Sequence, residues 1–212
     1  MSVTRLLVLG AVRIFQPTHG YFVRRELASW QVADWAHLNP GSIYNALRTL
    51  TNDGLLEQAV EPPTGTSSGA GRRQYRLTAD GEAEFHRLTR DALWQLHPYE
   101  PDWLLAGLSF WWVLTRQEVL DALSARRSQI EARIKGLGYA TADVRADRAT
   151  PEHVVEHFLV HEHQLRGELT WLDEVQARVR AGEYAFAGEA GVATMTVDGL
   201  EPGTRSAPSD DA

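Results

Sequence analysis

The stretch NPGSIYNALRTLTNDG, residues 39–54, carries the start, stop and periodicity signals of a helix. Asn39 is a favoured N-cap residue, Pro40 suits the first helical position, and Gly54 suits the position just after the last turn. Between these ends the apolar residues recur at helical spacing, at Ile43, Leu47 and Leu50. The pattern predicts a helix with one buried apolar face.

The opposite face of this helix is polar and suits contact with DNA. Its residues are Asn45, Arg48, Thr49 and Asn52, with Ser42 and Tyr44 at its flanks, and no acidic residue lies near the helix start. Asn and Arg side chains form specific hydrogen bonds with base edges in the major groove. An ordinary solvent-exposed helix face has a similar composition, so this helix alone leaves both interpretations open.

Two short strand patterns, at residues 55–60 and 72–77, follow the helix and predict a β-hairpin. The stretch between them is rich in Gly, Ser, Thr and Pro, which is typical of a loop. Arg72 and Arg73 stand where the chain leaves that loop. A hairpin that follows a helix in this way resembles the wing of a winged helix, where arginines bind the phosphate backbone.

Helical patterns at residues 4–14 and 19–30 complete this unit, with a plain connection expected at 31–38. The fold class predicted for the chain is mainly α. Residues 1–80 are expected to form a winged helix-turn-helix DNA-binding domain of three helices and a two-stranded wing.

Residues 81–182 are expected to form a helical dimerisation domain. A linking helix (79–97) and a buried, Trp-rich helix within 101–114 precede two long helices, at about 115–137 and 151–180, the first ended by Gly136 and Gly138. Both long helices carry heptad-like apolar seams, so helix-on-helix association is expected. The candidate dimer residues are Leu123, Ile130, Phe158, Leu165 and Leu172. Packing within one chain is the alternative. The tail, residues 183–212, is expected to be disordered.

Composition limits the possible classes of protein. The 212 residues include no cysteine, which excludes disulfides and thiolate chemistry, and no apolar run long enough for a membrane span. A soluble, cytoplasmic protein is expected. The net charge of −7 opposes DNA binding at first, but residues 1–100 carry ten Arg against ten Asp or Glu. DNA binding needs a locally cationic face, not a basic total.

The amino-terminal part resembles the PadR family of bacterial transcriptional regulators. The resemblance covers about residues 5–90 and is carried, in matching order and spacing, by His19-Gly20-Tyr21, Gly41-Ser42-Ile43-Tyr44, Ala46-Leu47, Leu50, Gly54-Leu55, Arg73-Gln74-Tyr75-Arg76-Leu77-Thr78 and Gly81. It implies a homodimer that binds double-stranded DNA at a pseudo-palindromic operator, usually as a repressor. Many members of the family release DNA when they bind a small aromatic ligand.

The resemblance also implies roles for individual residues. Ser42, Tyr44, Asn45 and Arg48 would face DNA, Tyr21 would lie near the backbone, and Arg72 and Arg73 would belong to the wing. Asn45 departs from the proline that is common in the family. Trp94 matches a position where some multidrug-binding members carry an aromatic residue, which suggests an effector site around Trp94, Trp111 and Trp112. Core or interface packing of these tryptophans is the alternative.

Two rival functions remain open. His153, Glu156 and His157 fit the H-x-x-E-H pattern of a metal-dependent hydrolase, but the sequence provides no clear third zinc ligand. We therefore expect no enzyme activity, no metal and no cofactor. The second rival is a degenerate winged helix that binds protein, although such a module would not need arginines in the wing or a polar third helix.

Overall fold

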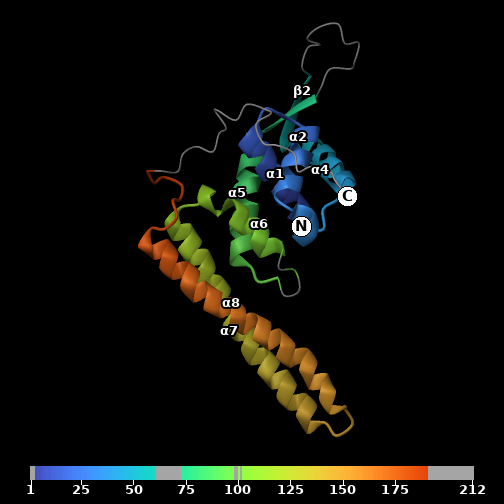
Figure 1. Cartoon of the computed structure of the whole chain (residues 1–212), viewed down its shortest axis with the longest axis vertical. Helices are drawn as coiled ribbons and strands as arrows, with labels where there is room; N and C mark the ends of the chain where they lie inside the picture. The colour runs from blue at the N-terminus through green and yellow to red at the C-terminus, as the bar shows by residue number, and fades with distance from the viewer. Residues whose placement is uncertain (1–2, 61–72, 98–99, 101, 191–212) are drawn as a thin grey trace, which may run out of the picture.

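The computed structural model describes residues 3–60, 73–97, 100 and 102–190. Helix α1 (Val3–Phe15) lies at the centre of the winged helix, with Leu6 to Val12 all buried. Around it pack α2 (Gly20–Ser29), α4 (Pro40–Asn52), α5 (Ala79–Trp94) and α6 (Asp102–Phe110) (Figure 1). The apolar start of the chain is thus a core helix, as expected from the sequence.

Helix α4 has the ends and the buried face that the sequence predicts. The Asn39 side chain accepts a hydrogen bond from the Ser42 backbone amide, Pro40 is the first helical residue, and Gly54 follows the helix with a φ of +73°. Ile43, Leu47 and Leu50 are buried. The preceding connection was expected to be irregular but contains a short helix, α3 (Val32–Trp35), because four residues are too few to show helical periodicity.

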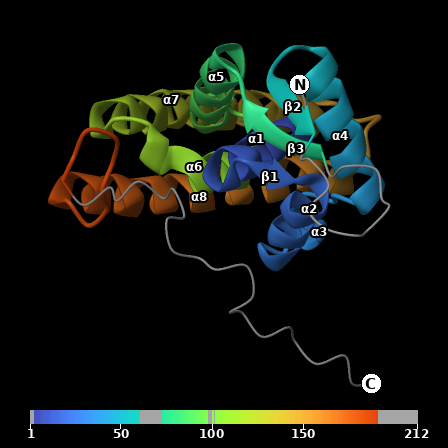
Figure 2. The same cartoon turned by 90° about the horizontal axis from the view of Figure 1, so that it is seen from above.

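The wing is part of a three-stranded antiparallel sheet. Strands β2 (Leu56–Val60) and β3 (Arg73–Leu77) pair with Leu56 opposite Leu77 and Val60 opposite Arg73. A two-residue strand, β1 (Thr18–His19), pairs with the other edge of β3, which gives the order β1-β3-β2 (Figure 2). The sequence predicted only the two strands of the wing. It missed β1, because two residues are too few to show the alternation of apolar and polar side chains that indicates a strand.

The two long helices form an antiparallel arm that extends from the body (Figure 1). They are α7 (Arg116–Ala146) and α8 (Glu156–Ala181), joined through a short 3-10 turn, η2 (Glu152–Val155). The expected end of α7 near residue 137 is wrong, because the helix runs through Gly136 and Gly138. Interior glycines cost about 1 kcal/mol each relative to alanine, and packing against α8 offsets that cost.

The heptad seams of α7 and α8 meet inside one chain. Leu123, Ile130 and Leu172 are fully buried and Leu165 nearly so, although no second chain is present. These four residues were predicted to lie between two chains, and the structure corrects this to an intrachain core. Only Phe158 of the five candidates keeps partly exposed surface.

The start of the predicted disordered tail is also corrected. Residues 183–190 fold back on the base of the arm, where Phe186 is fully buried and its backbone neighbour Ala187 donates a hydrogen bond to the Leu114 carbonyl. Arg116 fixes this segment by bonding the Tyr184 carbonyl and both carboxylate oxygens of Glu189. Residues 191–212 lie outside the described part. None of the described helices is both long and apolar enough to cross a bilayer.

Candidate nucleic-acid interface

The exposed face of α4 carries four of the residues predicted to contact DNA. Tyr44, Asn45, Arg48 and Thr49 are all exposed, and α4 contains no acidic residue. The Arg48 Nη2 atom donates a hydrogen bond to Asn45 Oδ1 at 2.7 Å. Because this bond uses the amide oxygen of Asn45, it orients the amide donors and the remaining guanidinium donors of the pair. Such a pair matches acceptor atoms, which guanine presents in the major groove.

Ser42 has a structural role that the sequence analysis did not predict. Its hydroxyl donates to the Asn39 carbonyl at 2.7 Å and accepts from the Asn39 amide at 3.2 Å. Together with the bond from the Ser42 amide to the Asn39 side chain, these form a capping box. Ser42 therefore caps the start of α4, and its contact with DNA stays a prediction.

The start of α2 lies beside α4 and adds a second exposed aromatic residue. Tyr21 is 60% exposed, and the Arg24 guanidinium carbon lies 5.3 Å from the centre of its ring. The Tyr44 ring crosses over Gly20 so closely that a Cβ at that position would lie 3.1 Å from Tyr44 Cε1. This close approach gives a physical reason for the glycine in the His19-Gly20-Tyr21 motif.

The arginines of the winged helix fall into two groups. Five form ion pairs with acidic side chains, namely Arg5, Arg13, Arg25, Arg87 and Arg90. Arg24, Arg48 and Arg73 have no acidic partner within the part of the chain that the structure describes. Arg76, likewise unpaired there, lies opposite Glu57 in the β2–β3 register.

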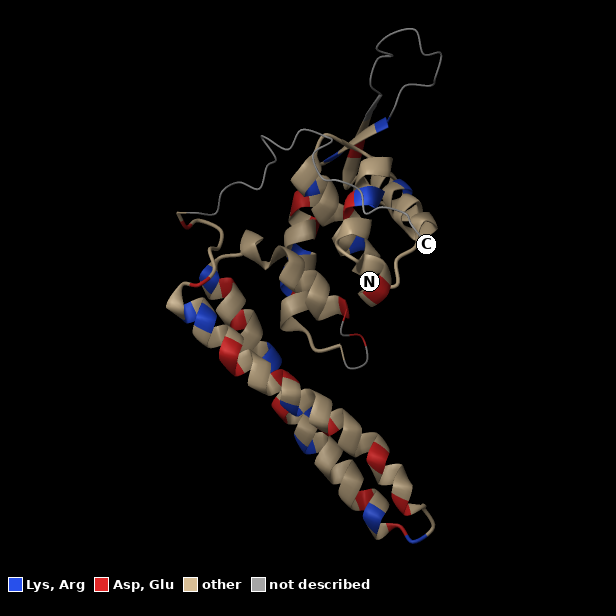
Figure 3. Ribbon diagram, viewed as in Figure 1, with Lys and Arg blue, Asp and Glu red and all other residues tan. Residues whose placement is uncertain are grey.

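The unpaired arginines concentrate positive charge on one end of the body. Blue segments on α2, α4 and the wing strand β3 lie at the end of the body away from the arm (Figure 3). His19 Nδ1 contacts the Arg73 carbonyl at 3.1 Å, which ties the loop end of β3 to β1, just before the start of α2. The predicted wing residue Arg72 lies outside the described residues.

The three tryptophans predicted to form an effector site are not brought together. Trp94 is 42% exposed near the end of α5. Trp111, in the 3-10 turn η1 (Trp111–Val113), packs against Tyr184 and Phe186 at ring distances of 5.0 and 5.4 Å. Trp112 lines a cavity whose lining includes neither Trp94 nor Trp111, and a shared effector site around Trp94 stays a prediction.

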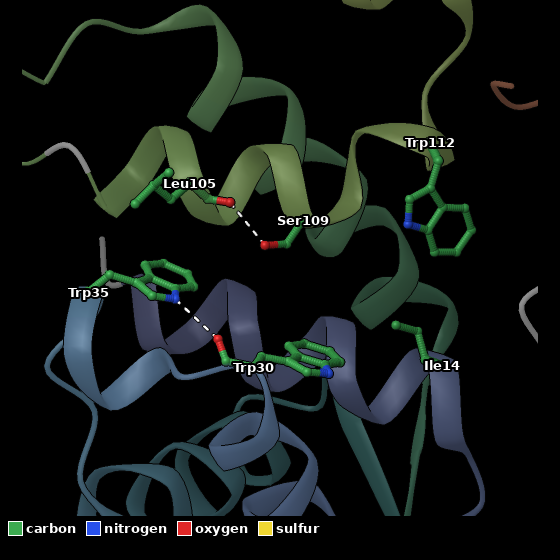
Figure 4. A pocket seen from close by; sticks show the side chains of 6 residues that line it. All are labelled: Ile14, Trp30, Trp35, Leu105, Ser109 and Trp112. Atoms are coloured by element: carbon green, nitrogen blue, oxygen red, sulfur yellow. Dashed lines mark hydrogen bonds between the residues drawn. The ribbon is translucent and has the colours of Figure 1, made fainter. Parts of the chain in front are cut away.

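That cavity, of about 440 Å³, lies between α1, the α2–α3 segment and α6 (Figure 4). Its lining residues are Ile14, Trp30, Trp35, Leu105, Ser109 and Trp112. Neither Trp30 nor Trp35 is among the functional residues predicted from the sequence. The only available signal was the presence of two tryptophans five residues apart, at the end of α2 and in the connection after it.

The histidine pattern does not form a compact ligand set. His153 lies in η2 and His157 in α8, and both are exposed, whereas His161 is buried. Among the described residues, no three His, Asp or Glu side chains are placed to hold a metal ion together.

The turn from α2 to the exposed helix α4, with the β2–β3 wing behind it, defines a winged helix-turn-helix protein. Residues 8–87, which make up most of this winged helix, match the family model described as "Transcriptional regulator PadR-like family". The resemblance inferred from the sequence is thereby confirmed.

Similar solved structures include three from Bacillus species. Bacillus subtilis PadR in complex with operator DNA is 21% identical, with a TM-score of 0.37 and coverage of 84% of this chain and 98% of that chain. The same protein with p-coumaric acid is 20% identical, with a TM-score of 0.34 and coverage of 84% and 99%. The PadR-like regulator BC1756 from Bacillus cereus is 17% identical, with a TM-score of 0.33 and coverage of 84% and 99%. No curated protein sequence matches the chain.

Proposed function

We propose that this protein is a homodimeric transcriptional repressor that binds a pseudo-palindromic operator and is released by a small aromatic effector. The observation that carries the DNA-binding part is the exposed, acid-free face of α4, on which Asn45 and Arg48 form a hydrogen-bonded pair. An ordinary solvated helix face would not require the unpaired arginines Arg24 and Arg73 on the neighbouring α2 and β3. Their positions suit phosphates on either side of a major groove.

The contacts divide into two kinds. Asn45 and Arg48 read base edges, because their donors lie on the helix that enters the groove. Arg24 and Arg73 bind phosphates from α2 and from the wing, and Tyr21 lies near the backbone beside Arg24. Phosphate contacts supply affinity without sequence preference.

Dimerisation takes place along the outer surface of the arm. Arg126 contacts Glu168 and Gln176 contacts Ser124, which sets the antiparallel register of α7 and α8. The same register brings Tyr139 close to the level of Val160, and these side chains are 63% and 57% exposed. Two copies joined there would place their α4 helices in successive major grooves, with half-sites about 10 base pairs apart.

The two kinds of DNA contact are expected to respond differently to mutation. Asn45→Ala or Arg48→Ala should reduce the preference for operator over random DNA by about 1–3 kcal/mol per lost base contact. Arg73→Ala should weaken binding to both DNAs alike and lower the slope of log affinity against log salt by about two, one for each subunit of the dimer. Fluorescence anisotropy at several salt concentrations measures both effects, on an operator selected from genomic fragments with the purified protein.

Arg166→Ala provides the control for these variants, since Arg166 is an exposed arginine on the arm. It should leave binding to both DNAs unchanged. Equal losses on operator and random DNA for Asn45, Arg48 and Arg73 variants would contradict the division into base and phosphate contacts. Failure of the wild-type protein to select any fragment would favour the protein-binding alternative.

The proposed dimer surface is tested by adding charge to it. Val160→Glu should shift the protein from dimer to monomer, because a carboxylate buried without a partner is strongly disfavoured. Ala177→Glu, at an exposed position near the other end of α8, is the matched control and should leave the dimer intact. Sedimentation velocity at micromolar concentration distinguishes the two states. A wild-type monomer, or an unchanged Val160→Glu dimer, would contradict this surface.

A further inference from the structure

The bond between Arg48 and Asn45 fixes which end of the asparagine amide is available to DNA. Arg48 Nη2 donates to Asn45 Oδ1 at 2.7 Å. A guanidinium group has donors and no acceptor, so the amide atom that faces it must be the oxygen. The amide nitrogen of Asn45 is therefore turned away from Arg48. Within the described part of the chain that nitrogen has no acceptor, so its N–H groups are available to a base.

The charge of Arg48 is not neutralised by a neighbouring carboxylate. Helix α4 contains no acidic residue, and Asp53, directly after it, pairs with Arg5 at 2.8 Å. Among the described residues, Asn45 is the one side chain that accepts a hydrogen bond from Arg48. The remaining N–H groups of Arg48 thus stay available for a DNA acceptor beside the amide of Asn45.

The backbone beneath the pair is held in place from both directions. The capping box of Asn39 and Ser42 fixes the start of α4, and the buried side chains of Ile43 and Leu47 fix the inner face of the helix. The Asn45 and Arg48 side chains are exposed on the other face, one helical turn apart. This platform presents the donors of both side chains to the same region of a groove.

A paired asparagine and a free asparagine suit different bases. A free asparagine binds adenine through two hydrogen bonds, because its oxygen accepts from adenine N6 and its nitrogen donates to N7. When Arg48 holds the oxygen, the N6 amino group of adenine would meet the N–H donors of the guanidinium. Guanine presents two acceptors in the major groove, O6 and N7, and both suit a donor.

We propose that Arg48 sets the base preference of Asn45, so that the pair selects guanine where asparagine alone would select adenine. This inference rests on the proposed function, because it names the base that the exposed face of α4 reads. The bond to Asn45 also orders the long side chain of Arg48 before DNA binds, which reduces the conformational entropy lost on binding. Arg48 is thus a base-contacting residue and, for Asn45, a positioning residue.

Selection from a randomised duplex library with the full chain tests this preference. Wild type should enrich G·C at a position of the half-site where Asn45→Ala shows no preference. Arg48→Met keeps the aliphatic stem but removes the donors, so it should enrich A·T at that position. Fluorescence anisotropy on two duplexes that differ only there should show guanine favoured by roughly fivefold to a hundredfold in wild type, the value of one bidentate base contact, and adenine favoured in Arg48→Met.

A modified base tests the role of the acceptor atoms. In 7-deazaguanine the N7 acceptor is replaced by a C–H group, while O6 and the base pair with cytosine remain. Substitution of this base for the selected guanine should weaken wild-type binding by roughly threefold to tenfold, the value of one hydrogen bond. Unchanged affinity would contradict a contact that uses both acceptors of guanine.

Arg24→Met is the matched control, because Arg24 lies on the neighbouring α2 and its guanidinium stacks on Tyr21 instead of bonding Asn45. It should weaken binding to both duplexes alike and leave the enriched base unchanged. The inference is overturned if Asn45→Ala selects the same site as wild type, if Arg48→Met still enriches G·C, or if Arg24→Met also changes the base. In each case the wild type still selects a sequence, so the proposed function stands. A wild type that enriches no sequence would overturn the proposed function and this inference with it.

Discussion

Gly81→Ala is expected to destabilise the protein by on the order of 3 kcal/mol, toward the upper end of the usual cost of overpacking. A Cβ atom on Gly81 would lie 2.0 Å from the backbone oxygen of Leu55, a separation that no folded protein tolerates. That oxygen also accepts a hydrogen bond from the Thr78 amide at 3.1 Å, so it cannot move freely away. A loss of this size is a large fraction of the 5–15 kcal/mol that stabilises a typical native protein.

The matched control is Gly136→Ala, in the interior of α7. A Cβ at Gly136 has nothing within 4 Å, so alanine should stabilise the helix by about 0.5–1 kcal/mol. Urea unfolding followed by circular dichroism measures both variants. Equal stabilities for Gly81→Ala and wild type would show that α5 does not start directly against Leu55. The contact between Gly81 and Leu55 joins the base of the wing to α5, the helix that leads toward the arm.

Local signals in the sequence were sufficient for the elements of the winged helix. Asn39 is the N-cap of α4, as predicted, and Thr78 caps α5 in the same way, each accepting a hydrogen bond from the amide three residues later. These capping interactions involve only residues close in sequence, so they do not depend on how the rest of the chain packs. Strand β1 contains two residues and helix α3 contains four. Elements that short have no periodicity to detect, and they form because the surrounding structure places them.

The site was predictable only where it depends on one helix. The exposed face of α4 follows from helical periodicity, and the structure confirms the exposure of Asn45 and Arg48. The capping role of Ser42 was missed, although its position three residues after Asn39 is the spacing of a capping box. The cavity was missed because Trp30 and Trp112 are far apart in sequence, and nothing local to either one indicates the other.

The arm shows a further limit of reading helices from sequence. A heptad seam has the same pattern whether its partner helix belongs to the same chain or to a second copy. The seams that contain Leu123 and Leu172 therefore predicted correctly that each long helix packs against another helix. They could not show whether that helix belongs to the same chain or to a second copy. Arg126 lay inside the α7 pattern without a stated role, and the structure shows it to be 3% exposed.

Removing the partner of Arg126 is expected to cost about 3–5 kcal/mol, because a buried charge is then left without its counter-charge. Arg126 Nε donates to Glu168 of α8, and Arg126 Nη1 donates to the Gln95 carbonyl at the end of α5 at 2.7 Å. This single side chain therefore joins both arm helices to the winged helix. Glu168→Ala should lower the urea midpoint strongly. In the proposed dimer, where the arm would set the spacing of the two α4 helices, it should also weaken binding to a two-half-site operator.

The double variant Arg126→Met with Glu168→Leu separates a missing charge partner from a missing contact. Apolar residues that replace a buried ion pair often preserve stability, so the double variant should be much closer to wild type than Glu168→Ala. Glu162→Ala is the control in the same helix, because its pair with the 60% exposed Arg166 should contribute less than about 1 kcal/mol. If the double variant is as unstable as Glu168→Ala, the cost comes from lost packing at this junction, and unpaired charge is not its cause. If Glu162→Ala costs as much as Glu168→Ala, burial does not distinguish the two pairs.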